Sequence, residues 1–223
     1  MTQNPANQST DKETVAQAKP EVSTNKRGLE RRRKLLEVAE KHFFSFGYAG
    51  TSVNEIVKEA GGSLNTLYRY FGNKLGLFEA VFRLKTDELF TPFAHMDFWQ
   101  DDIETNLFRF GECLQRVTST PDGIAVYRLV VTENNFEQSE IQRIFYQLGP
   151  QTGIRILGDY LQRMKDKGKL ELEDPYLAAS QFIEMIKGPF LYPRLFGETI
   201  EEQQLHQALK QAIHIFLNGC LQK

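Results

Sequence analysis

The sequence predicts an all-α protein with a basic N-terminal part and an acidic C-terminal part. Apolar residues recur at helical spacing through most of the 223 residues, and no stretch shows the period-two alternation bounded by turns that is typical of β-strands. Residues 26–85 carry 12 basic and 6 acidic side chains, whereas residues 86–223 carry 13 and 20. No apolar run approaches the roughly 18 residues of a membrane span. A chain of this length can bury a sizeable core, in two small domains or one large one.

The chain begins with a segment that has almost nothing apolar to bury. Residues 1–26 are rich in Asn, Gln, Ser and Thr, so we expect a disordered tail. The charge-dense segment Lys26 to Lys34 follows, and two interpretations are open. It is either a solvated helix start, with Glu30 paired to Lys34, or a basic arm that lies along phosphates or in a minor groove. The first helix is then expected to bury a stripe made of Leu35, Leu36, Ala39, Phe43 and Phe46.

Two short helices joined by a glycine-containing turn are predicted between Thr51 and Lys74. Thr51 and Ser52 can cap the first helix through their hydroxyl groups, which fixes its start near Val53. Gly61 can adopt the left-handed conformation that ends a helix. Chains use this arrangement to lay the second helix in the major groove of DNA. The apolar positions of the first short helix are Val53, Ile56, Val57 and Ala60.

The second short helix presents a polar face outward. Ser63 can cap its start, while Leu67 and Phe71, spaced i, i+4, turn inward. Asn and Arg side chains can pair bidentately with purine edges, and Thr, Tyr and Lys side chains can reach phosphates. The predicted DNA-binding residues are Thr51, Ser52, Ser63, Leu64, Asn65, Thr66, Tyr68, Arg69, Tyr70 and Lys74.

Several short motifs accompany this pattern: Phe-x-x-x-Gly from Phe43, Ala-Gly-x-Ser from Ala60, Thr-Leu-Tyr-x-Tyr-Phe from Thr66, and the single residues Thr51 and Lys74. With them, the segment from about residue 28 to 84 resembles the DNA-binding domain of TetR-family regulators. The resemblance implies a three-helix helix-turn-helix domain over residues 27–85, with the motif at about 52–71, that binds an operator in double-stranded DNA. Gly62 stands where an apolar residue is usual and Asn65 where Gly is frequent, so the operator sequence does not follow from the resemblance.

A fourth helix begins at Lys74 and continues past Leu84 toward Pro92. Its apolar positions Leu75, Phe78, Val81 and Phe82 hold it to the first helix. This helix therefore joins the DNA-binding part to the remainder, residues 86–223. Further helices are expected at about 101–119, 121–135, 139–148, 150–166, 174–195 and 199–221.

The last two of these helices carry broad apolar stripes, and Gly188 with Pro189 should kink the first of the pair. Two such helices are enough for half of a four-helix bundle, which a second copy of the chain would complete as a homodimer. Burial within one chain is the alternative. The stripe residues are Leu177, Ala178, Phe182, Ile183, Ile186, Leu205, Leu209, Ala212, Ile213, Phe216 and Leu217.

The runs Val126–Asn135, Phe145–Pro150 and Asp174–Phe182 are similar to the C-terminal domain of AefR-like regulators, in the AcrR-like branch of the same family. This resemblance implies a helical domain that binds a ligand and dimerises, but it names no ligand.

Aromatic residues are abundant after Thr86. Most are expected to pack in the core, yet pockets between helices are lined by such residues together with a few polar groups. We expect a pocket for a small, largely apolar ligand among Phe93, Trp99, Phe108, Tyr127, Arg128, Phe145 and Tyr146.

No catalytic, cofactor or metal site is indicated by the sequence. It lacks the G-x-S-x-G and H-E-x-x-H patterns and a phosphate-binding glycine loop. Cys113 and Cys220 lie far apart and are expected to be buried thiols. His206 and His214 lie about two helical turns apart, too far to share a metal ion, and are expected to be partly buried or at an interface.

The sequence thus predicts a cytoplasmic, homodimeric transcriptional repressor that a small molecule releases from its operator. Two alternatives remain. One is a DNA-binding protein of the same fold that responds to a protein partner or to no signal, and the other is an enzyme or carrier with the same helical core. Loss of operator affinity on adding a low-molecular-weight cell fraction would distinguish the ligand-released repressor from both alternatives.

Overall fold

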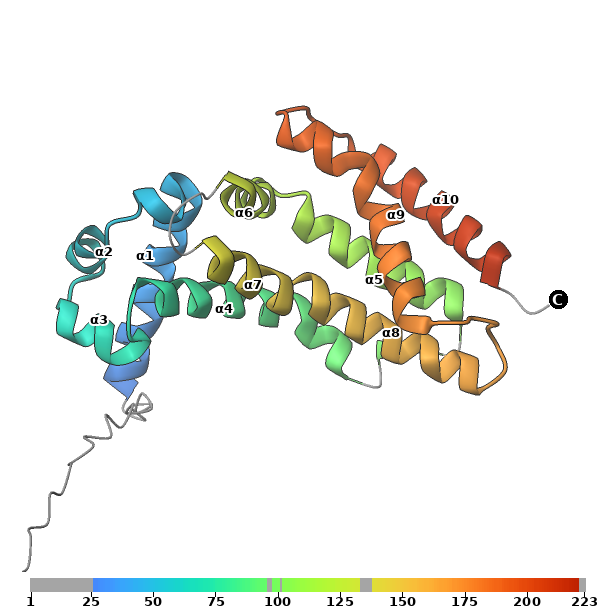
Figure 1. Cartoon of the computed structure of the whole chain (residues 1–223), viewed down its shortest axis with the longest axis horizontal. Helices are drawn as coiled ribbons and strands as arrows, with labels where there is room; N and C mark the ends of the chain where they lie inside the picture. Colours follow the sequence, from blue (N-terminus) through green and yellow to red (C-terminus); the bar gives the residue numbers. More distant parts are fainter. Residues whose placement is uncertain (1–25, 96–97, 101, 133–137, 221–223) are drawn as a thin grey trace, which may run out of the picture.

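The computed structural model describes residues 26–95, 98–100, 102–132 and 138–220. Over these ranges the chain forms ten α-helices and no β-strand, so the predicted all-α class is confirmed. The molecule is elongated, with α1 to α3 at one end and α9 and α10 at the other (Figure 1). The predicted disordered tail lies outside the described residues, except for Lys26, which begins α1. None of the described helices is both long and apolar enough to cross a membrane.

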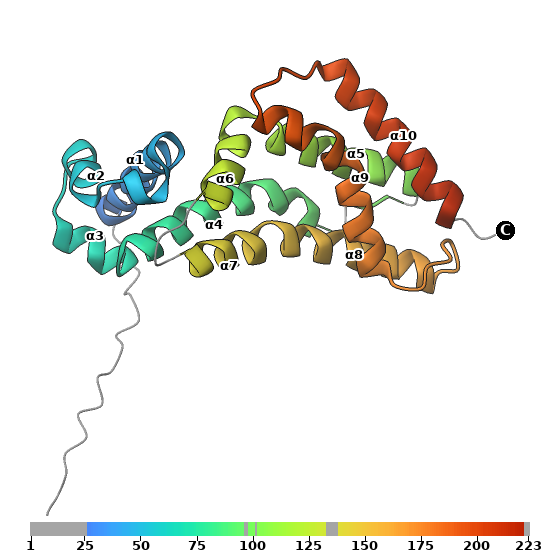
Figure 2. The ribbon, with the colours of Figure 1, turned by 45° about the horizontal axis from the view of Figure 1, so that its top comes forward.

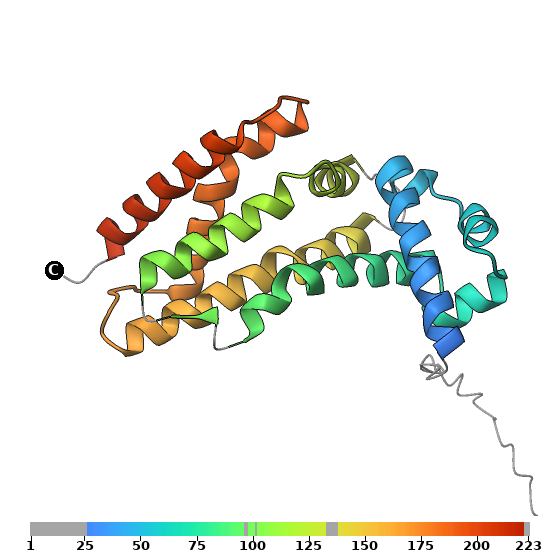
Figure 3. The same ribbon diagram turned by 180° about the vertical axis from the view of Figure 1, so that it is seen from behind.

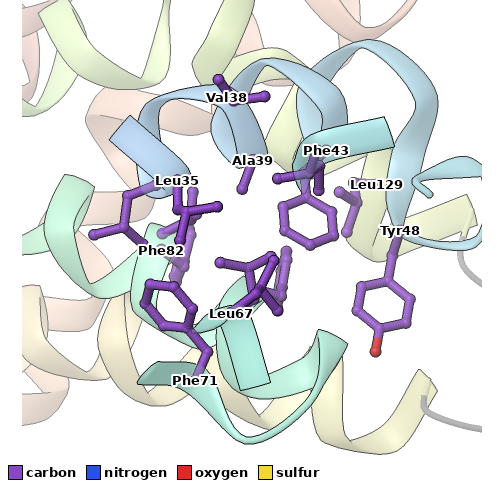
Figure 4. Close-up of a cluster of buried hydrophobic side chains, with 14 of the residues drawn as sticks. Leu35, Val38, Ala39, Phe43, Tyr48, Leu67, Phe71, Phe82 and Leu129 are labelled. Atoms are coloured by element: carbon purple, nitrogen blue, oxygen red, sulfur yellow. The ribbon is translucent and has the colours of Figure 1, made fainter. Parts of the chain in front are cut away.

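The N-terminal helices surround one apolar core. They are α1 (Lys26–Gly50), α2 (Val53–Ala60), α3 (Leu64–Phe71) and α4 (Lys74–Ala94), and α1 packs against the other three. Figure 4 shows side chains such as Leu35 and Phe43 from α1, Leu67 from α3 and Phe82 from α4 pointing toward one another. The predicted inward faces of α1 and α3 are therefore confirmed, with one exception on α1.

The exception is Phe46, which was expected in the buried stripe but is 60% exposed. The backbone leaves the helical conformation at Gly47 (φ 71°, ψ 179°), and this turns Tyr48 inward. The Tyr48 ring stacks on Phe43 at 5.8 Å between centroids and meets Phe78 edge-on at 5.6 Å. Because Tyr48 fills the core at this end of α1, Phe46 stays outside.

The core of the N-terminal helices does not end at the predicted domain boundary after residue 85. That boundary falls inside α4, which is one continuous helix from Lys74 to Ala94. Leu129 and Val130 from α6, with Ile141 and Ile144 from α7, complete the same core. Figure 4 shows Leu129 beside Phe43. The two halves of the chain are thus joined by packing as well as by α4.

The C-terminal helices follow the predicted ranges closely. They are α5 (Ile103–Thr118), α6 (Pro121–Thr132), α7 (Gln138–Leu148), α8 (Pro150–Asp166), α9 (Pro175–Leu195) and α10 (Glu202–Cys220). The last helix begins at Glu202 rather than near residue 199, and residues 133–137 at the predicted end of α6 lie outside the described residues. Helix α6 lies between α1 and α9 (Figure 2), and α7 and α8 run beside α4 (Figure 3).

A second apolar core joins α5, α8, α9 and α10 to the end of α4. Two glycines allow its helices to approach closely: a Cβ at Gly111 would lie 2.4 Å from Leu209, and one at Gly158 would lie 2.4 Å from the Tyr176 ring. As predicted, α9 is bent (Figure 1), and Pro189, which cannot donate a backbone hydrogen bond, lies inside it.

Most of the stripe predicted to form a dimer contact is buried in this second core. Its buried members are Ala178, Phe182, Ile183, Ile186, Leu209, Ala212, Ile213 and Phe216. The alternative, burial within one chain, therefore holds for these residues, because the stripes of α9 and α10 face α5 and α8. Leu177 remains 56% exposed, and Ile215, which was not in the predicted stripe, is 53% exposed.

Candidate nucleic-acid interface and internal cavity

Side-chain caps fix the helix-turn-helix segment. Ser52 at α2, Ser63 at α3 and Asn73 at α4 each accept a hydrogen bond from a backbone amide in the first turn of the helix, at 3.4, 3.2 and 2.8 Å. Such caps satisfy amides that have no partner within the helix. Gly61 follows α2 with φ 71°, a conformation that favours glycine. The predicted start and end of α2 and the predicted cap of α3 are confirmed.

The outer face of α3 is polar. Asn65, Tyr68 and Arg69 are exposed, Thr66 is half-buried, and Leu67 lies completely inside. The Arg69 guanidinium is 5.5 Å from the centroid of the neighbouring Tyr70 ring. Helix α3 thus presents an amide, a phenol and a guanidinium on one surface, the groups that read base edges and bind phosphates.

Two predicted DNA-binding residues make hydrogen bonds within the fold. Thr51 was expected to share the capping of α2, but it is buried, and its hydroxyl donates to the Gly47 carbonyl at 2.6 Å. Tyr70 was expected to face outward, but it is half-buried, and its hydroxyl donates to the Gly28 carbonyl at 3.2 Å. Both side chains bind backbone carbonyls of α1, and helical spacing does not predict such contacts.

Leu64 and Lys74 also lie closer to the fold than expected. Leu64 is half-buried and packs against the N-terminal core. The Lys74 ammonium donates to the Ala49 carbonyl at 3.4 Å and lies 4.6 Å from the centroid of the Tyr48 ring. These contacts hold the start of α4 against the end of α1, so Lys74 positions α4 as well as carrying charge.

The basic segment Lys26–Lys34 forms the first turns of α1, beside the helix-turn-helix segment. Arg31 lies next to the turn between α2 and α3, since its Nη1 would be 3.8 Å from a Cβ at Gly62. The Arg32 guanidinium is 5.3 Å from the ring centroid of Phe71. In the described part of the chain, this segment's ion pair joins Arg33 to Glu37 rather than Glu30 to Lys34. The segment is therefore a helix start that places positive charge next to α3.

Two polar contacts tie α1 to its neighbours. His42 is buried, and its Nε2 lies 2.9 Å from a Glu59 carboxylate oxygen on α2. The Lys85 ammonium of α4 lies 2.8 Å from a Glu40 carboxylate oxygen. Neither contact was predicted, because both join helices that are distant in sequence.

A cavity of about 470 Å³ lies between α4, α5, α6, the start of α8 and α9. The predicted pocket residues Tyr127 and Phe145 line it. Helix α4 contributes the largest share of its wall, from Phe82 to Pro92. The lining residues are Phe44, Phe82, Lys85, Thr86, Glu88, Leu89, Phe90, Pro92, Cys113, Leu114, Arg116, Val117, Thr118, Thr120, Asp122, Gly123, Val126, Tyr127, Phe145, Gly149, Pro150, Gly153, Ile183 and Lys187.

Three aromatic residues predicted in the pocket belong to the second core. Phe93 is buried and lies 5.0 Å from the Phe110 ring. Trp99 stacks on Tyr160 at 4.3 Å, and its indole N–H donates to the Phe93 carbonyl at 3.0 Å. Phe108 contacts the second core and meets the ring of His206 on α10. These rings pack in or against the second core rather than in the cavity wall.

Arg128 and Tyr146 also lie outside the cavity wall, on outer faces of α6 and α7. Tyr146 is 53% exposed. Arg128 donates to the carbonyls of Arg194 and Leu195, at 3.3 and 2.9 Å, and so caps the C-terminal end of α9. The sequence pattern identified α6 and α7 as pocket helices but placed two of their residues on the wrong side.

No cluster of three or more His, Cys, Asp or Glu side chains in the described residues is arranged to hold a metal ion. His206 and His214 are both exposed, and His214 contacts the Asn218 amide. Cys113 is half-buried in the cavity wall, whereas the side chain of Cys220 lies outside the described residues.

Two family models match the chain. Residues 35–81 match the tetR family of bacterial regulatory proteins, and residues 105–219 match the C-terminal domain of AefR-like transcriptional repressors. Among curated proteins, the chain is 24% identical over 188 residues to the HTH-type transcriptional regulator YvkB of Bacillus subtilis, covering 84% of this chain and 95% of that protein. Over 77 residues it is 35% identical to the regulator SAUSA300_2515 of Staphylococcus aureus, covering 34% and 40% of the two chains.

Solved structures share the fold. A TetR-family regulator from Mesorhizobium loti matches with a TM-score of 0.78 at 23% identity, covering 89% of this chain and all of that one. The flavonoid-responsive regulator FrrA matches with a TM-score of 0.71 at 24% identity, covering 86% and 98% of the two chains.

Proposed function

The chain belongs to the TetR family of bacterial transcriptional regulators, and we propose that it is a homodimeric repressor released from its operator by a small molecule in the cavity. One observation carries this proposal: α4 begins directly after α3 and forms the largest part of the cavity wall. A molecule that pushes on α4 must therefore also move the DNA-binding helices or strain their packing.

We propose α3 as the recognition helix. Asn65 and Arg69 have the side chains and exposure needed to pair with base edges, while Thr66 and Tyr68 suit phosphates or bases. Ser52 and Ser63, at the starts of α2 and α3, lie where helix amides favour a phosphate. The basic start of α1 adds sequence-independent attraction.

The homodimer is proposed to form through the outer faces of α9 and α10. One chain has one α3, whereas helix-turn-helix dimers bind two half-sites about 34 Å apart, one turn of DNA. Leu177, Tyr192 and Ile215 expose apolar surface on these helices, at 56%, 64% and 53%. Such exposed apolar groups favour a contact with a second copy.

The packing of α4 supports the proposed release mechanism. Helix α4 packs in the N-terminal core through Phe78 and Phe82, and Phe82 also lines the cavity. Close-packed interiors transmit small displacements rather than absorb them. A ligand that shifts α4 by a few ångströms would change the separation of the two α3 helices and disfavour DNA.

The test uses DNA selected from random sequence by the protein itself. Operator binding is measured by fluorescence anisotropy, with and without a low-molecular-weight fraction of cell extract. Val126→Trp, which fills the cavity from α6, should abolish the response, whereas Val131→Trp on the exposed face of the same helix should keep it. Circular dichroism checks that both variants fold. If the cell fraction released the Val126→Trp variant from DNA as readily as it releases the wild-type protein, the cavity would not carry the signal.

A further inference from the structure

The charged residues around the cavity differ in how they meet solvent. Glu88, Arg116 and Asp122 are exposed, and Lys85 pairs with Glu88 and a carboxylate on α1. Lys187 is different, because its side chain is only 13% exposed although it carries an ammonium group. A buried cation is costly unless it is paired and hydrogen-bonded, so the surroundings of Lys187 decide what this part of the wall can bind.

Lys187 lies between a solvent-facing carboxylate and a half-buried phenol. Its ammonium donates to Glu184 at 2.6 Å, and the Glu184 side chain is 60% exposed. On the other side, the ammonium lies 5.8 Å from the centroid of the Tyr127 ring. An ammonium has three N–H donors, so its hydrogen bonds with Glu184 and with the Tyr127 hydroxyl leave it able to bind one further oxygen on the cavity side.

The phenol of Tyr127 is a second donor at the same place. Burial raises the pKa of Tyr127, and the nearby Lys187 opposes that rise through its charge and as a hydrogen-bond partner. The net pKa is above the ordinary value, so the hydroxyl keeps its proton at neutral pH and can donate it to an acceptor oxygen.

The rest of the cavity is mainly apolar. The Phe145 ring meets the Tyr127 ring edge-on, with 5.4 Å between centroids, and is tilted against the Phe82 ring, with 5.6 Å between centroids. The aromatic wall therefore continues from the phenol to α4. Phe90 and Ile183 extend this wall. Tyr127 on α6 and Lys187 on α9 therefore lie beside an aromatic wall that reaches α4.

We propose that the ligand is a small acid, with an apolar ring-containing body and one anionic oxygen group held between the Lys187 ammonium and the Tyr127 hydroxyl. This rests on the proposed function, since it describes the ligand of the same cavity. A carboxylate or an ionised phenol has the required chemistry: it accepts from both donors and neutralises the buried cation. Neutral compounds of the same shape do not neutralise the Lys187 charge. The anion would also join α6 to α9, and α6 packs against α1 and its core.

The test compares 2-naphthoate with 2-naphthamide, which has nearly the same shape and no charge, by isothermal titration calorimetry on the full chain. Wild type should bind the carboxylate at least about tenfold more tightly, the effect typical of a hydrogen bond to a charged group. Lys187→Met should remove this preference while keeping its affinity for the amide, and Lys187→Arg should partly restore it. Tyr127→Phe should reduce the preference. Arg155→Met, which removes an exposed charge on α8 outside the cavity lining, should leave it unchanged.

Three outcomes would overturn the proposal: equal binding of acid and amide by wild type, a preference that survives in Lys187→Met, or no binding of either compound. Operator release by the cell fraction is measured independently. If that fraction releases DNA while the naphthalene compounds show no acid preference, the repressor proposal stands and the ligand class is wrong. If the acid preference is found but no small molecule releases DNA, the site stands and the release mechanism fails.

Discussion

Replacing Arg69 by Ala should weaken operator binding while leaving the protein folded. Arg69 is exposed on α3, and its guanidinium lies 5.5 Å from the centroid of the adjacent Tyr70 ring. An exposed cation–π contact contributes at most about 0.5 to 1 kcal/mol, and Ala regains a little helix propensity. The free energy of unfolding should therefore change by no more than about 0.5 kcal/mol. Urea titration can measure this upper limit.

The effect on DNA should be larger. A bidentate contact from Arg to a guanine is worth about 1 to 3 kcal/mol of discrimination, which corresponds to roughly a 5- to 160-fold rise in Kd. Fluorescence anisotropy with selected DNA measures this change, and a repeat of the selection with the variant should show relaxed preference at one base pair per half-site. Arg155→Ala is the matched control, because Arg155 is exposed on α8, far from α3 in sequence and fold. Unchanged affinity in Arg69→Ala, or an equal loss in the control, would refute the placement of α3.

Three further predictions concern packing and charge. Gly111→Ala should lower the free energy of unfolding, measured by urea titration, by about 1 to 3 kcal/mol, because its Cβ would lie 2.4 Å from Leu209. Gly188→Ala, which has open space around it, should be neutral or stabilising. Tyr70→Phe should cost about 1 kcal/mol of stability by losing its hydrogen bond to the start of α1, and a loss confined to DNA affinity would contradict this role. Replacing arginines 31–33 by Gln should lower operator affinity most at low salt without changing the selected sequence, and equal binding across a salt series would favour a merely solvated helix start.

Local rules in the sequence predicted the DNA-binding end of the molecule well. Capping depends on residues three apart, so Ser63 could be assigned to the start of α3 from sequence alone. The inward positions Leu67 and Phe71 follow from helical periodicity. These interactions stay within one helix, and a single sequence contains all the information they need.

The errors arose where distant segments compete for the same space. Phe46 and Tyr48 are both plausible core residues by spacing, and the break at Gly47 decides in favour of Tyr48. Phe93 and Trp99 have the character of pocket residues, but the position of α8 gives Trp99 a stacking partner and draws both into the core. Periodicity shows which face of a helix is apolar, but it does not show which helix covers that face.

The cavity residue Lys187 was not predicted, although the sequence contains an indication of it. It is a charge in the middle of the apolar helix α9, directly before Gly188 and Pro189. A charged side chain that is mostly withdrawn from solvent and lines a cavity is a candidate binding group. Its partner Tyr127 lies 60 positions earlier, so only the fold brings the two together.

In the proposed mechanism, the cavity and the DNA-binding surface are coupled through α4. The most direct test is calorimetric titration of the compound that releases the operator, first into free protein and then into the protein–operator complex. Coupling between two binding sites is reciprocal, so a compound that releases DNA must bind the complex more weakly, typically by about 5- to 150-fold. Equal affinities in the two titrations would contradict the coupling, and tighter binding to the complex would make the compound a co-repressor.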